Sequence, residues 1–269
     1  MNSPILTETA NAILQRFRRT PEEIADYLRH IDENCGDPHF CLIRLSSLAR
    51  DEALHAYYNE SDLTGFRQWM YVSGKLQLQR LPENCFHGYP CLRLWAVLLS
   101  NHAGLREHLA WFPERYPLER SEHFPWVLKT RQLPCHANHQ VWLHQLAMRG
   151  DWEALRREAG RALNEHPKST KGYVLLDARY LLALANRDLP TMQECLAELL
   201  KPRIRKARND LALLDELLSI DVLVLAKLAW LHGIEIDPQS DYVPRDWLPM
   251  TPNPEYVDPY DFMKTIELP

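Results

Sequence analysis

The sequence has few of the signals that mark a β-sheet. It contains 9 glycines and no Asn-Gly or Asp-Gly pair, the dipeptides that most often close a two-residue β-hairpin. Leucine outnumbers valine and isoleucine together by 44 to 19. Leucine favours helices, whereas the β-branched residues favour strands. We therefore expect an all-α fold.

The common catalytic motifs are also missing. There is no HExxH, no GxSxG and no dinucleotide fingerprint, and Gly74-Lys75 lacks a preceding glycine at the spacing of a phosphate loop. These absences argue against the usual zinc-protease, hydrolase and nucleotide-binding classes. We expect neither catalytic residues nor a cofactor.

Metal-ligand spacing is approached only at Cys135, His136, His139 and His144. A His-x-x-His step on a helix brings two imidazoles near one face, but no second pair follows at finger spacing, and the six cysteines form no CxxC. We interpret these histidines as solvated or hydrogen-bonded groups near a helix start. A helical enzyme that uses them is the alternative from a different functional class.

The bulk composition is that of an ordinary globular protein, with 46% hydrophobic and 25% charged residues. A net charge of −5 does not favour nucleic acid as a partner, because nucleic-acid-binding domains are usually basic. No apolar run is long and uncharged enough for a membrane span, and no targeting segment is visible. We expect a cytoplasmic protein with reduced thiols and a protein or small-molecule partner.

Helix signals divide the chain into four expected parts. These are an N-terminal helical subdomain (1–112), a packed irregular linker (113–136), a helical-hairpin domain (137–248) and an extended, proline-rich acidic tail (249–269). The first firm boundary is Thr20-Pro21-Glu22-Glu23, which predicts a capping box at the start of a helix.

The third part predicts stacked helical hairpins around a buried C-terminal helix. One hairpin turns at Gly150-Asp151, and a second runs from Gly172 to Pro202. A nearly all-apolar run predicts the central helix, over residues 209–232, and such a helix is usually buried among others. Asp221 lies within this run, so we expect a structural buried charge paired with Arg179, Arg203 or Arg205. The basic segment Lys201–Arg208 is interpreted as a solvated connection, and an anionic surface as its partner is the alternative.

The stretch LLSIDVLVLAKLAWLHGIEI, from Leu217 to Ile236, and the following Ser240–Leu248 segment resemble the immunity protein 49 family of bacterial polymorphic-toxin systems. The similarity is weaker from Ala137 onward through the hairpins, and residues 1–130 show none. The resemblance implies a cytoplasmic, non-enzymatic protein that binds a cognate toxin, encoded beside it, and blocks it.

Such an inhibitor needs a rigid surface, and acidic loops would steer it toward a basic cleft. The candidate partner-binding residues lie in two loops: Asp237, Asp241, Tyr242, Tyr57, Tyr58, Glu60 and Asp62. The alternative function is a helical-repeat scaffold or adaptor for another protein partner.

Overall fold

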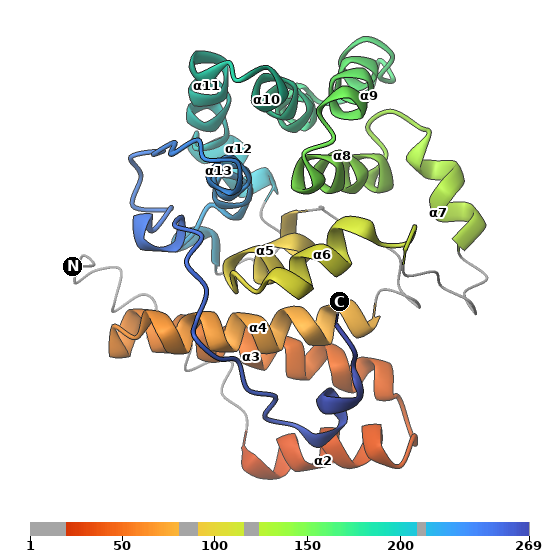
Figure 1. Ribbon diagram of the computed structural model, residues 1–269, viewed down its shortest axis with the longest axis vertical. Helices are drawn as coiled ribbons and strands as arrows, with labels where there is room; N and C mark the ends of the chain where they lie inside the picture. The colour runs from red at the N-terminus through yellow and green to blue at the C-terminus, as the bar shows by residue number, and fades with distance from the viewer. Residues whose placement is uncertain (1–19, 81–90, 116–123, 209–213, 269) are drawn as a thin grey trace. The chain divides into compact units, whose positions relative to one another are not determined.

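The computed structural model describes residues 20–80, 91–115, 124–208 and 214–268 (Figure 1). Within these ranges it contains twelve α-helices and no strand, which confirms the predicted all-α class. The chain divides into two compact units. The first comprises residues 1–81, 96–108 and 251–269, and the second comprises residues 82–95 and 109–250.

The first unit is organised around a long helical hairpin. Helix α2 spans Pro21–Asp32, α3 spans Pro38–Glu60 and α4 spans Leu63–Arg80. The predicted capping box is confirmed, because Thr20 and Glu23 each bond the other's backbone N–H. Ser61 lies in the left-handed region (φ 55°) and ends α3, so the chain reverses into α4.

Small residues let α3 and α4 pack closely. The hydroxyls of Ser46 and Ser73 lie 3.2 Å apart, and each also bonds the other residue's carbonyl. Gly74 has a similar role toward α5 (Cys91–Leu99), because a Cβ there would lie 3.2 Å from the Val97 backbone nitrogen. Helix α6 follows at Ala103–Trp111.

Residues 251–268, within the segment predicted as an extended tail, belong to the first unit. The Gln68 side chain bonds both backbone groups of Val257, at 2.6 and 3.1 Å. Asp258 accepts hydrogen bonds from Lys75 Nζ at 2.7 Å and from the Tyr71 hydroxyl at 2.9 Å. These bonds hold an irregular segment that leads into the 3₁₀ helix η4, Asp261–Thr265.

The second unit contains the predicted hairpins. Helices α8 (Ala137–Arg149) and α9 (Trp152–Asn164) form the first, and α10 (Leu175–Asn186) and α11 (Leu189–Leu199) form the second. Both turns combine a left-handed C-cap, Gly150 or Arg187, with an aspartate N-cap, Asp151 or Asp188. Helix α7 (Phe124–Arg131) occupies part of the segment predicted as an irregular linker.

The central helix is shorter than predicted. Helix α13 spans Ile220–Leu231, preceded by the short helix α12 (Pro202–Arg208) and the 3₁₀ turn η2 (Leu214–Glu216). Residues 209–213 lie outside the described ranges. The helix starts late because Ser219 is extended (φ −108°, ψ 90°) and its N–H donates to the Tyr242 carbonyl at 2.8 Å.

Burial of α13 follows the prediction. All residues from Ile220 to Ala229 are buried, and the helix packs against α8, α10 and α11 (Figure 1). Across the described ranges, no helix combines the length and the apolar character that crossing a bilayer requires.

Candidate partner-binding surface

The segment from Ile236 to Leu248, here called the acidic loop, follows α13 and places charged groups on the outside. Four apolar side chains of the segment are buried at 0–4% exposure: Ile236, Val243, Trp247 and Leu248. Asp241 and Asp246 are exposed between these anchors, and Asp237 is half-buried. The apolar anchors therefore fix which carboxylates face solvent.

Lys227 of α13 holds the end of the acidic loop. Its side chain is fully buried, and Nζ donates to the carbonyls of Trp247, Leu248 and Pro249 at 2.6, 3.1 and 2.9 Å. At the start of the loop, Trp230 Nε1 donates to the Ile236 carbonyl at 2.9 Å. A loop tied at both ends loses little conformational entropy when a partner binds.

Tyr242 is half-buried within the acidic loop and stacks on an arginine. The Arg205 guanidinium carbon lies 3.8 Å from the centre of the Tyr242 ring, a cation–π contact, and Arg205 is only 6% exposed. Asp237 accepts a hydrogen bond from the Gln239 N–H at 2.9 Å and lies 3.5 Å from Arg245. The three residues predicted here, Asp237, Asp241 and Tyr242, thus share one ordered segment.

Of the candidate residues predicted in the other loop, in the first unit, only the two acidic ones are exposed to solvent. Tyr57 and Tyr58 are 8% and 5% exposed, and their rings meet edge to face at 5.1 Å, so both belong to the core. The Tyr57 ring also lies 5.8 Å from the Phe66 ring. Glu60 and Asp62 are exposed, and Asp62 also accepts a hydrogen bond from the Gly65 N–H at 2.8 Å.

Asp221 is 9% exposed and pairs with an arginine that the sequence did not single out for it. Arg208, itself 2% exposed, donates from Nε to Asp221 at 2.7 Å and from Nη2 to both carboxylate oxygens of Asp177 at 2.7 and 2.9 Å. The expected partners are engaged elsewhere or exposed: Arg179 pairs with Glu194, Arg205 stacks on Tyr242, and Arg203 is exposed. Arg208 lies in the predicted basic segment, but nothing local distinguishes it from its neighbours.

The three candidate histidines have different structural roles. His136 caps α8 by accepting from the Asn138 N–H at 3.1 Å. His139 and His144 are fully buried, and burial lowers the pKa of both, that of His139 to about 4. His144 Nδ1 lies 2.8 Å from the Gln140 carbonyl, whereas His139 faces Glu158 at 3.9 Å. In the part of the chain that the structure describes, no three His, Cys, Asp or Glu side chains gather as a metal site.

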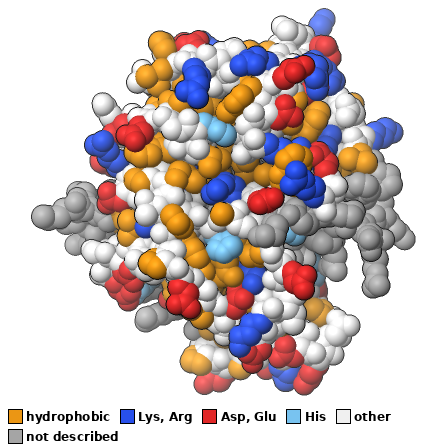
Figure 2. All heavy atoms as spheres, in the orientation of Figure 1, with side chains coloured by type: hydrophobic (Ala, Val, Ile, Leu, Met, Phe, Trp, Pro, Cys, Tyr) orange, Lys and Arg blue, Asp and Glu red, His pale blue; other side chains and the backbone are white. Residues whose placement is uncertain are grey.

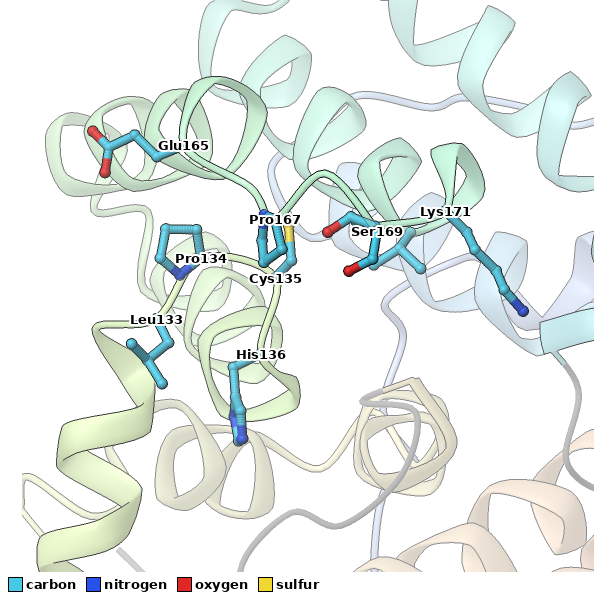
Figure 3. Close-up of a pocket in the computed structure, with 10 residues that line it drawn as sticks. Leu133, Pro134, Cys135, His136, Glu165, Pro167, Ser169 and Lys171 are labelled. Carbon is cyan, nitrogen blue, oxygen red and sulfur yellow. The ribbon is translucent and has the colours of Figure 1, made fainter.

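A hollow of about 650 Å³ opens between the α7–α8 connection and the chain that follows α9 (Figure 3). We call it the Cys135 pocket. Leu133, Pro134, Cys135 and His136 form one side, and the opposite side comes from residues 165–174.

On the face of the molecule drawn in Figure 2, acidic and basic side chains are interspersed with hydrophobic ones.

These features define an all-α protein of stacked helical hairpins with an anchored acidic loop on its surface. The family model of Immunity protein 49 matches residues 63–247, more than half of the 269-residue chain. The chain belongs to this family. The match begins at Leu63, so it includes α4, α5 and α6, where the sequence alone showed no resemblance. No curated protein and no solved structure matches the chain.

Proposed function

We propose that this protein is an immunity protein that binds a cognate toxin effector and neutralises it by covering the toxin's functional site. Membership of the Immunity protein 49 family carries this proposal. The mode of action is binding rather than catalysis.

The acidic loop is the proposed contact for a basic region of the toxin. Its carboxylates are held outward by buried anchors and by Lys227, so binding costs little ordering. Negative charge on such a loop accelerates association with a positively charged cleft and competes with an anionic substrate there. Glu60 and Asp62 form a second, separate acidic candidate in the first unit.

Co-expression with the adjacent open reading frame tests the function. The neighbour alone should stop bacterial growth, and growth should return when the full-length protein is present and co-purifies at a fixed ratio. A harmless neighbour that does not bind would refute the proposal and favour the scaffold or adaptor alternative.

Charge reversals then test the acidic loop. Asp241→Lys should slow association on the order of threefold at low salt and less at high salt, because the effect is electrostatic. Glu255→Lys is the matched control, since both carboxylates are exposed and both changes alter the net charge equally. Equal effects of the two variants on the association rate would remove the loop from the proposal.

A further inference from the structure

The Cys135 pocket has largely apolar walls, and no residue of the acidic loop lines it. Leu133, Pro134, Pro167 and Val174 are among its lining residues, and the polar members include Lys171 and Ser169. Figure 3 shows Pro134 and Pro167 on opposite sides. Apolar pockets with a few polar groups are the usual form of sites that receive a ligand or a partner's side chain.

Several bonds hold the walls in place. Cys135 is a non-glycine residue in the left-handed region (φ 65°), and its Sγ donates to the Ala162 carbonyl at 3.7 Å. Arg161 of α9 donates to the Gln132 carbonyl at 2.9 Å, which links the two sides. The Thr170 N–H donates to the Pro167 carbonyl at 2.8 Å. A pocket built this way is preformed, so filling it requires little rearrangement.

Exposed hydrophobic side chains cluster beside the pocket. Among the described residues six large hydrophobic side chains are exposed, and three of them lie within residues 126–133: Trp126 (40%), Leu128 (41%) and Leu133 (49%). Leu133 lines the pocket, and the Trp126 ring meets the ring of His136, another lining residue, at 5.5 Å. Single exposed hydrophobics are ordinary, whereas a cluster beside a cavity indicates an interaction surface.

The charge at this surface differs in sign from that of the acidic loop. Lys168 and Lys171 are exposed in the chain that follows α9. The carboxylate of Glu165, on the same side, lies 3.5 Å from Arg161, which also pairs with Glu158 at 2.6 Å. Glu158 has a second partner in Arg157 at 2.9 Å, so the two carboxylates are balanced by two arginines. A protein with a net charge of −5 therefore presents positive charge at this apolar site, which suits an apolar side chain with a carboxylate nearby.

We propose that the Cys135 pocket binds an apolar side chain of the toxin, presented on a surface segment that also carries an acidic residue beside it. This inference rests on the proposed function and divides the binding between two surfaces. The acidic loop governs the association rate of the toxin, and the apolar side chain in the pocket governs its dissociation rate.

The test measures binding of the toxin encoded by the adjacent reading frame to full-length variants by surface plasmon resonance. Leu133→Glu should raise the dissociation rate on the order of tenfold or more, because a buried apolar contact is replaced by a charge. Leu189→Glu is the matched control: Leu189 is 41% exposed, close to the 49% of Leu133, but it begins α11 and does not line the pocket. Its dissociation rate should stay within about twofold of wild type. Lys171→Glu should also accelerate dissociation, by repelling the toxin's carboxylate.

Thiol labelling gives a second readout. Toxin binding should protect Cys135 from alkylation, while Cys35, a half-exposed thiol in the first unit, should react as before. Melting temperatures of the variants establish that they fold.

The possible outcomes are distinct. If the toxin binds wild type but Leu133→Glu and Leu189→Glu behave alike, with Cys135 still reactive, the pocket proposal is overturned and the immunity function stands. If the wild-type protein does not bind the toxin, both proposals fail together.

Discussion

The buried ion cluster around Arg208 gives the sharpest prediction for stability. Its guanidinium, 2% exposed, bridges Asp177 of α10 and Asp221 of α13, and Nη1 donates to the Tyr173 carbonyl at 2.7 Å. One side chain thus ties together three elements of the second unit. Arg208→Met removes the positive charge and leaves two buried carboxylates without it.

The expected loss in the free energy of unfolding is about 3–5 kcal/mol, the range found when one member of a buried ion pair is deleted. Arg203→Met on the same helix is the control, because Arg203 is exposed and its loss should cost less than about 0.5 kcal/mol. Urea unfolding followed by far-UV circular dichroism measures both.

A third variant separates two contributions to the free energy of unfolding: that of Arg208 itself, and the penalty of leaving two buried carboxylates without a positive partner. Combining Arg208→Met with Asp177→Asn and Asp221→Asn removes all three charges, so this protein should be more stable than the single Arg208→Met variant. If Arg208→Met costs no more than Arg203→Met, or if the triple variant is the least stable, the reasoning about uncompensated buried charge is refuted.

Three further predictions concern the rest of the molecule. Burial lowers the pKa of His139 from 6.5 to about 4, so the unfolded chain binds a proton that the folded chain excludes between these values. Stability should fall on acidification through this window, on the order of 3 kcal/mol from this residue, and His139→Gln should flatten the pH dependence in urea titrations. Lys227→Met should lower stability by about 2–4 kcal/mol, because three carbonyls lose a charged donor, and should speed proteolysis within the acidic loop; unchanged cleavage would contradict this. Asp258→Ala leaves the buried Lys75 without its carboxylate and should increase hydrogen exchange across residues 251–265, whereas Glu255→Ala should not.

Much of the fold was predictable because its signals are local. The capping box of Thr20 and Glu23 acts over three residues, and each hairpin turn carries its own caps. The α13 run is apolar on every side, which predicts burial whatever the neighbours are. This run, together with the segment Ser240–Leu248, indicated the family that the match over residues 63–247 shows.

The candidate surface was less predictable. Asp237, Asp241 and Tyr242 could be placed after the central helix because the loop follows it directly in the chain. The burial of Tyr57 and Tyr58 could not be predicted from the sequence, because tyrosine occurs both in cores and at interfaces. Which of the two applies depends on the residues that pack against it. The Cys135 pocket was missed for a similar reason, since its two walls are about thirty residues apart in the sequence.

Local sequence is enough for the helical class, for the positions of the caps and turns and for the burial of the central helix, since each depends on residues within a few positions of one another. Tertiary packing is needed to show which arginine neutralises Asp221, why α13 starts only at Ile220 and which carbonyls accept hydrogen bonds from Lys227. Those outcomes depend on groups that are distant in sequence and meet only when the helices pack, so no local pattern records them.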